Sequence, residues 1–325
     1  MSSKKRKLSG LDGLQLRLAY DRLLRLQQTF MIEEGDEKSA SDSASQGFEA
    51  QIEETLQLML SRLEGLSSFN FSSAAEDSLR RLKIHFEHTL ELAEGYKDKA
   101  ATAAKLGSDK LWSAKHFHDH LYMLQGHVAR SNEACARTCI DAFMFRAAAM
   151  LPNDKYVVLN MEHRIAPLRV SPNSLTSIGV GGFVDYTALV SDQRTARIYL
   201  KKPVLNRFKK SPPGLFVVEA KYENLSDQVA QAICEMYACA KELSVKVIRG
   251  AITSGYRWIF LHLTLNENGE GGRYYESSEL DFPSHLDNDG NVNMKEKDAD
   301  LITAIVAAWM EHGLSAIEKD DFFTV

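Results

Sequence analysis

The stretch that decides the fold reads Leu215-Phe216-Val217-Val218-Glu219-Ala220-Lys221. Its four consecutive apolar residues, 215–218, predict a strand that is buried on both faces of a sheet. Because side chains alternate along a strand, Glu219 and Lys221 point to the same face at its end, about 7 Å apart along the chain. Charges at the edge of a core are costly unless they are paired or bind a metal. This strand end is therefore the first candidate for a functional site.

A second acidic residue precedes this strand in the run Val184-Asp185-Tyr186. An acid-x-Lys strand end that faces a carboxylate on a neighbouring strand can hold Mg²⁺ beside a nucleophilic water. The pattern therefore indicates phosphodiester hydrolysis. The alternative is a simple salt bridge between Glu219 and Lys221 at a strand end, with Asp185 in a turn, and the sequence leaves that alternative open.

Asp185, the Glu219-Ala220-Lys221 triplet and Gln231 in a following helix together resemble the core of the PD-(D/E)XK nuclease superfamily. The resemblance covers roughly residues 126–280 and implies a restriction-endonuclease-like fold, an α/β architecture with a mixed sheet flanked by helices. In one departure, Val184 stands where the motif has proline. In another, the long separation of the two acidic residues implies an insertion between their strands. More distantly, the layout resembles the nuclease-like C-terminal domains of Crinkler-type fungal effectors.

The resemblance also implies roles for these residues. Asp185 and Glu219 would bind Mg²⁺ or Mn²⁺ directly, with the backbone carbonyl of Ala220 as a third ligand. Lys221 would orient or deprotonate the attacking water and offset charge that develops on the phosphate. Gln231 would hydrogen-bond Lys221 or the phosphate.

Two further positions have competitors. Many members of the superfamily carry an acidic residue early in the first core helix, and Glu133 occupies that place here, with Glu162 as the alternative. Gln228 competes with Gln231, but Gln231 pairs with Glu235 at a spacing of four residues on one helix face, which favours Gln231.

A basic segment separates the two acidic strands. Inside a chain with a formal net charge of −5, such a segment predicts a surface that contacts phosphates. A solvated hairpin tip is the alternative. No base-reading module is evident, so we expect backbone contact with little sequence preference, and DNA rather than RNA as the partner. The residues concerned are Lys201, Lys202, Arg207, Lys209 and Lys210.

The first ten residues predict a basic, disordered tail that contains the tetrad Lys4, Lys5, Arg6 and Lys7. Such a tetrad is the minimal nuclear-import signal, so the expected location is the nucleus and one expected partner is a nuclear-import receptor. A solvated terminus of a cytoplasmic protein is the alternative. No apolar run approaches the roughly 20 residues that a membrane span needs, so no membrane association is expected.

The remaining chain divides into two predicted regions. Residues 11–125 read as helical, with an acidic, serine-rich linker at 33–48, and a third helix that starts at Ser73 and continues past Phe86. The apolar faces of these helices should be buried in a small bundle or in a homodimer contact. Residues 126–325 should form the α/β domain, with helices at 128–149, 225–243 and 296–311 and strands that include 155–161, 175–181, 183–190, 196–200 and 214–221.

The leading prediction is a metal-dependent nuclease that hydrolyses DNA with little sequence specificity. The alternative, from another class, is a nuclease-fold protein without catalysis that binds nucleic acid or protein, as an effector would.

Overall fold

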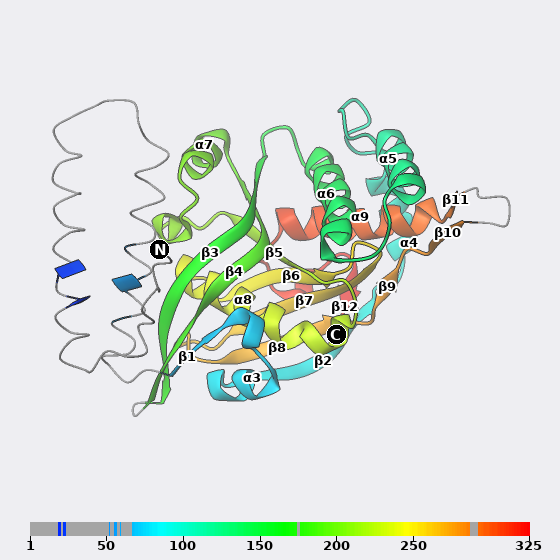
Figure 1. The fold of residues 1–325 in the computed structure, drawn as a ribbon. Coiled ribbons are helices and arrows are strands. Elements are labelled where there is room, and N and C mark those ends of the chain that lie inside the picture. Colours follow the sequence, from blue (N-terminus) through cyan, green and yellow to red (C-terminus); the bar gives the residue numbers. More distant parts are fainter. Residues whose placement is uncertain are drawn as a thin grey trace, which may run out of the picture. The chain divides into compact units, whose positions relative to one another are not determined.

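The computed structural model describes residues 67–173, 176–286 and 292–325, together with single positions or pairs of residues between 19 and 59 (Figure 1). The predicted basic tail with Lys4–Lys7 and the acidic linker 33–48 lie outside the described residues. Of the predicted helical region 11–125, for which a small bundle or a homodimer contact is expected, nearly all residues up to 66 also lie outside the described residues. The chain divides into two units, residues 70–165 with 181–325, and residues 1–69 with 166–180. The candidate site lies entirely in the first.

Seven helices and twelve strands occur in the described residues. The helices are α3 (Glu76–Leu82), α4 (Tyr96–Ala103), α5 (Ala114–His127), α6 (Glu133–Met150), α7 (Gln193–Lys201), α8 (Val229–Leu243) and α9 (Glu296–Glu311). The strands are β1 (Ser67–Asn70), β2 (Ile84–Leu92), β3 (Tyr156–Asn173), β4 (Thr176–Ser191), β5 (Gly214–Ala220), β6 (Val247–Thr253), β7 (Arg257–Leu265), β8 (Gly272–Ser277), β9 (Leu280–Asp281), β10 (Ser284–Leu286), β11 (Val292–Met294) and β12 (Phe323–Thr324). Short 3-10 turns lie at Phe71–Ser73, Leu205–Phe208, Leu225–Gln228 and Ile317–Lys319.

Ten of these strands form one mixed sheet. Its order is β1-β4-β5-β6-β7-β8-β2-β12, with β3 paired to β4 and β9 paired to β7. β5 runs antiparallel to β4 but parallel to β6, and β2 runs parallel to β8. The predicted α/β class with a mixed sheet and flanking helices is thus confirmed.

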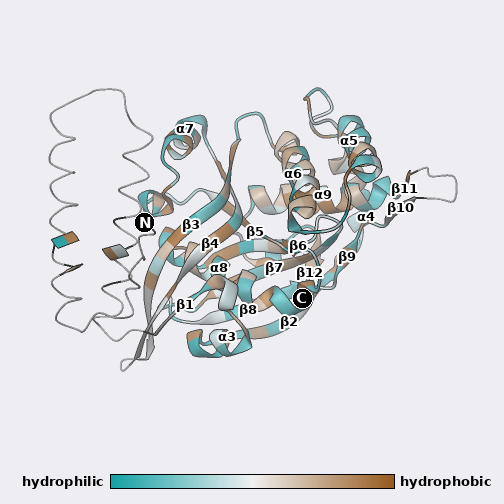
Figure 2. Cartoon of the chain, viewed as in Figure 1, coloured by the Kyte–Doolittle hydropathy of each residue, from teal (hydrophilic) through white to brown (hydrophobic). Residues whose placement is uncertain are grey.

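β5 is buried on both faces, as its apolar run predicts. Phe216 and Val218 face one side, where they join the hydrophobic core formed with α6 and α9. Figure 2 shows the largely apolar ribbons of α6 and α9, in contrast to the mixed pattern of α5 and α7. The other face of β5 carries Glu219, which contacts α8. The fold therefore places the strand's one carboxylate under a helix and not in open solvent.

The predicted third helix is wrong beyond residue 82. α3 ends at Leu82, because Lys83 adopts a left-handed backbone conformation with φ of 57°. Residues 84–92 then form β2, which pairs with β8 and β12. Long-range pairing overrides the local helical pattern here. Residues 84–92 therefore belong to the same sheet as the candidate site, and the predicted boundary at residue 126 does not separate a helical region from an α/β region.

Two other local predictions differ from the structure. The segment 196–200, predicted as a strand, lies in α7, whose first turn is capped by Asp192: its Oδ1 accepts hydrogen bonds from the backbone N–H groups of Arg194 and Thr195 at 2.8 and 3.1 Å. The two strands predicted at 175–181 and 183–190 are one continuous strand, β4. In the stretches that the structure describes, no helix is both long and apolar enough to cross a membrane.

Candidate active site

β4 and β5 bring the two predicted acidic residues together. In their antiparallel register Tyr186 pairs with Val218, so Asp185 and Glu219 come next in line on the two strands. The Oδ2 atom of Asp185 accepts a hydrogen bond from the backbone N–H of Ala220 at 2.9 Å. A carboxylate on one strand therefore reaches across to the end of the other, close to the acid-x-Lys triplet.

Glu219 is the centre of a hydrogen-bonded cluster. Its Oε1 atom lies 2.6 Å from the Nζ of Lys221 and accepts a 2.6 Å hydrogen bond from the side-chain amide of Gln231 on α8. The side chain of Glu219 is 3% exposed and that of Lys221 is 20% exposed, so the lysine forms the solvent side of the pair. The structure thus brings together Asp185 from β4, Glu219 and Lys221 from the end of β5, and Gln231 from α8, all of which the sequence predicts as site residues.

A second buried acid, Glu235, lies one helical turn beyond Gln231. The amide nitrogen of Gln231 also donates to Oε1 of Glu235 at 3.0 Å. Glu235 is completely buried, and its Oε2 atom has no hydrogen-bond partner among the described residues. From the sequence, Glu235 is expected only as a partner of Gln231. A single acid within the otherwise small and apolar run 232–240 was the available signal for a buried carboxyl.

The surroundings shift the protonation of both glutamates. Burial, followed by the negative charge of Asp185, raises the pKa of Glu219 to about 7. Burial and the neighbouring Glu219 raise the pKa of Glu235 well above its ordinary value. Both shifts favour the protonated, neutral form of these carboxyl groups, and a proton on one of them can bridge the pair.

Lys221 stays a cation. Burial alone would lower the pKa of its ammonium group, but the charge and hydrogen bond of Glu219 outweigh burial and raise it. A lysine with a raised pKa is a poor general base and a good source of fixed positive charge. Of the two roles considered for Lys221, orienting water and stabilising charge fits this geometry better than deprotonating water.

Arg137 on α6, which the sequence analysis missed, joins three acids. Its guanidinium forms ion pairs with Asp185, with Glu133 at 3.0 Å and with Glu162 at 3.0 Å. Glu133 and its competitor Glu162 therefore contact the same cation, and in this arrangement neither contacts Lys221. The Glu133–Arg137 spacing of four residues in a helix was the sequence signal for this pair.

Glu162 reaches Arg137 from a strained backbone position. It lies within β3 but has φ of 50°, in the left-handed region that costs a residue with a Cβ about 1–2 kcal/mol. Strain of this kind persists only where surrounding contacts enforce it. The ion pair with Arg137 is the contact that the structure offers for Glu162.

The donor set suits a magnesium-like ion. No group of three or more His, Cys, Asp or Glu side chains that could hold a metal occurs within the part of the chain that the structure describes. Mg²⁺, however, needs only one or two carboxylates and keeps several waters. Asp185 and Glu219 supply two carboxylates; burial and then the charge of Asp185 raise the pKa of Glu219, and a bound cation would counter that charge. The backbone carbonyl of Ala220, predicted as a third ligand, lies at the same strand end.

The predicted basic segment is at the surface, within and after α7. Lys201 ends this helix and Lys202 caps it, Arg207 lies in the following 3-10 turn, and Lys209 and Lys210 come directly after. None of the five forms an ion pair within the described residues. α7 adds Arg194 and Arg197, which line a shallow groove together with Lys201. These two arginines were missed because the segment was read as a strand.

Comparison with known proteins adds no relative: no protein-family model matches this chain, and no curated protein matches its sequence.

Proposed function

We propose that this protein is a metal-dependent nuclease with a restriction-endonuclease-like fold that hydrolyses DNA phosphodiester bonds with little sequence preference. The observation that carries the proposal is the convergence of Asp185, Glu219, Lys221 and Gln231 at the end of β5, next to the middle of β4 and to α8. A plain salt bridge at a strand end explains Glu219 and Lys221. It does not explain why a second carboxylate lies beside them, or why the buried Gln231 donates hydrogen bonds to both Glu219 and Glu235.

Asp185, Glu219 and the carbonyl of Ala220 would hold Mg²⁺ or Mn²⁺. When bound, such an ion supplies a water of lowered pKa and positive charge at the scissile phosphate. Lys221 would hold that water and stabilise negative charge on the phosphate oxygens. Gln231 would fix the orientation of the Glu219 carboxylate through its 2.6 Å hydrogen bond to Oε1.

The protonation of Glu219 predicts how the activity depends on pH. Only the carboxylate form binds a divalent cation well, and its pKa is raised to about 7. The cleavage rate at limiting Mg²⁺ should therefore rise between about pH 6 and 8. Since a bound cation favours the carboxylate, saturating Mg²⁺ should move this rise to lower pH.

The basic surface around α7 supports nucleic acid as the substrate. Its side chains form no ion pairs within the described residues, so they remain available for phosphates. Non-specific contacts with phosphates are salt-dependent, and DNA binding should weaken steeply as salt increases. From the Lys4–Lys7 tetrad we also propose that an import receptor carries the protein into the nucleus.

The test is cleavage of supercoiled plasmid and of linear single-stranded DNA in the presence of Mg²⁺, Mn²⁺ or EDTA. Lys221→Met and Glu219→Gln should lower the rate about 100-fold or more. Lys241→Met is the matched control, because Lys241 forms a 3.2 Å ion pair with Glu270 at the other end of α8 and is 24% exposed, close to the 20% of Lys221. Cleavage that persists in EDTA, or that Lys221→Met leaves intact, would contradict the proposal.

A second candidate is a nuclease-fold protein without catalysis that binds nucleic acid. It is favoured by the ion pair between Arg137 and Asp185, which already neutralises one of the two carboxylates that a metal needs. Well-folded protein that retards DNA on a gel but cleaves no substrate would support this candidate over the enzyme.

A further inference from the structure

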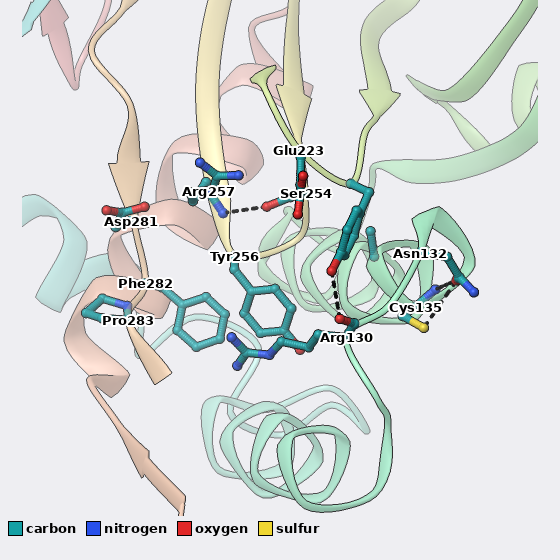
Figure 3. A pocket seen from close by; sticks show the side chains of 12 residues that line it. Arg130, Asn132, Cys135, Glu223, Ser254, Tyr256, Arg257, Asp281, Phe282 and Pro283 are labelled. Carbon is teal, nitrogen blue, oxygen red and sulfur yellow. Dashed lines mark hydrogen bonds between the residues drawn. The ribbon is translucent and has the colours of Figure 1, made fainter. Parts of the chain in front are cut away.

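A cavity of about 460 Å³ opens beside the candidate active site (Figure 3). Its wall includes Tyr222 and Glu223, the first two residues after Lys221, and Ser254, which follows Thr253, the residue whose carbonyl accepts a hydrogen bond from the backbone N–H of Lys221. The cavity and the acid-x-Lys triplet therefore share one edge of the sheet, at the ends of β5 and β6.

The first turn of α6 connects the same two places. Asn132, Cys135 and Ala136 line the cavity, whereas Glu133 and Arg137, between and beside them in sequence, belong to the carboxylate cluster. Neighbouring positions on a helix point about 100° apart, so two adjacent faces of one helix serve the two sites. A molecule bound at the Asp185–Glu219 end would extend naturally into this cavity.

Aromatic rings and an arginine form a stacking surface inside it. Tyr256 stacks on the buried Phe282 with ring centres 5.4 Å apart and an angle of 19° between the ring planes, and the guanidinium of Arg130 lies 3.6 Å from the centre of the Tyr256 ring. Figure 3 shows the three side chains next to one another in the cavity. The hydroxyl of Tyr222 donates to the backbone carbonyl of Arg130 at 2.9 Å, which holds this wall in place. Because Phe282 is buried and Arg130 covers the ring of Tyr256, the exposed guanidinium is the planar group of this stack that a bound molecule meets. Unpaired nucleobases stack on arginine guanidinium planes as well as on aromatic rings.

The charges of the wall favour a base over a phosphate. Arg130 and Arg257 are balanced by Glu223 and Asp281, and Arg257 also forms a 3.5 Å ion pair with Glu279. Acidic side chains repel a phosphate, but with Ser254 and Asn132 they offer both donors and acceptors to the edge of a neutral ring.

We propose that this cavity accepts one unpaired nucleobase next to the scissile phosphate, so that the preferred substrate is single-stranded DNA or an unpaired DNA end. The inference rests on the proposed nuclease function. A base inside a duplex cannot enter such a cavity unless it is unstacked and unpaired, which costs a few kcal/mol. Single-stranded DNA avoids that cost, and duplex DNA should be the poorer substrate.

The test places a single abasic site at each position of a labelled single-stranded oligonucleotide and measures kcat/KM for cleavage. One position flanking the cut should lose about tenfold, the order expected for one stacked base. Tyr256→Leu, which keeps apolar volume but removes the ring, should cause a similar loss with the intact oligonucleotide and no further loss with the abasic one. Tyr156→Leu is the control, since Tyr156 is an exposed tyrosine that does not line the cavity.

Binding of the same oligonucleotides in EDTA, followed by fluorescence anisotropy, makes the result independent of cleavage. Cleavage that no abasic position affects, with an unchanged Kd, would overturn the base site and leave the nuclease standing. An abasic-sensitive Kd without any cleavage would support the base site and reject the nuclease. Equal Kd values for all abasic oligonucleotides would overturn the base site, whatever the result for cleavage. Because the oligonucleotide carries the change, the test holds even if Tyr256→Leu fails to fold.

Discussion

Two buried charge clusters lie on the central strands of the same sheet, and they are built differently. On β6, Arg249 forms a 2.5 Å ion pair with Asp320, with side-chain exposures of 2% and 1%. The Oδ1 atom of Asp320 also accepts hydrogen bonds from the backbone N–H groups of Phe322 and Phe323, both at 2.8 Å. One cation thus meets one anion, and backbone donors occupy the anion's second oxygen.

The cluster around Glu219 lacks that balance. Two fully or nearly buried acids, Glu219 and Glu235, lie beside Asp185, and Lys221 is the one cation in contact with Glu219 among the described residues. The pKa of Glu219 is raised to about 7, and Glu235 keeps an oxygen without a described partner. Arg137 pairs with Asp185 and Lys221 with Glu219, so the cluster contains one more buried acid, Glu235, than it has cations in contact among the described residues. Perturbed carboxyl groups beside a partly exposed lysine at a strand end are more typical of a functional site.

The largest effect on stability should come from breaking the balanced pair. Arg249→Met leaves Asp320 buried without its cation and should lower the free energy of unfolding by about 3–5 kcal/mol. Urea denaturation measures this loss, and Lys246→Met is the control, because the ion pair of Lys246 with Glu267 is exposed and should contribute less than about 1 kcal/mol. Cleavage per folded molecule should stay unchanged in Arg249→Met. If Arg249→Met lowers the free energy of unfolding no more than Lys246→Met does, the Arg249–Asp320 pair does not stabilise the fold.

Local contacts of the Glu219 cluster could be predicted from the sequence, whereas its long-range contacts could not. The apolar run before Glu219 predicts a buried strand, and the Gln231–Glu235 spacing predicts their contact on one helix face; both are local patterns. Arg137 could not be assigned in this way, because its partners Glu162 and Asp185 lie on β3 and β4, far away in the sequence. Contacts of that kind depend on strand register, which only the assembled sheet defines.

Long-range strand pairing also explains why part of the predicted secondary structure is wrong. Residues 84–92 read as a helix, yet they complete the sheet beside β8, a partner almost 190 residues further along the chain. The cavity beside the site is another such case. Its aromatic pair, Tyr256 and Phe282, comes from a turn and a late loop whose proximity no local pattern indicates.

The additional buried acid in the Glu219 cluster should make the stability of the fold depend on pH. A glutamate has a pKa of about 4.3 in the unfolded chain. If its pKa is higher in the folded protein, the folded state loses stability as the pH rises from about 4.3 through the folded pKa. Between pH 5 and 7 the native protein should therefore lose stability relative to Glu235→Gln, by up to about 1.4 kcal/mol per pH unit. Urea denaturation at pH 5, 6 and 7 measures the difference, with the exposed Glu267→Gln as the control. Parallel curves for the native protein and Glu235→Gln would contradict a shared, raised pKa.

A bound cation should relieve the same excess. Mg²⁺ at ten times its Kd should raise the free energy of unfolding by about 1.4 kcal/mol, and Asp185→Asn should remove most of that gain. At one fixed Mg²⁺ concentration the gain should be larger at pH 8 than at pH 6, since Glu219 must lose its proton to bind the ion. Thermal unfolding with and without Mg²⁺ measures it, and Glu270→Gln should keep the full gain. An equal Mg²⁺ effect in Asp185→Asn would place the cation elsewhere.

The smallest effect should come from the rim of the site. Glu133 is 42% exposed and forms an ion pair with Arg137 on the same helix, so Glu133→Gln should change stability by less than about 0.5 kcal/mol. If Glu133 acts only through Arg137, Glu133→Gln should lower the cleavage rate less than tenfold. In the Arg137→Gln background, Glu133→Gln should then cause no further loss. If Glu133 instead contacts the bound ion or its water, Glu133→Gln should approach the loss of Glu219→Gln and should persist in the Arg137→Gln background. The double-mutant cycle therefore decides whether the acid of the first core helix belongs to the reaction or only positions an arginine beside it.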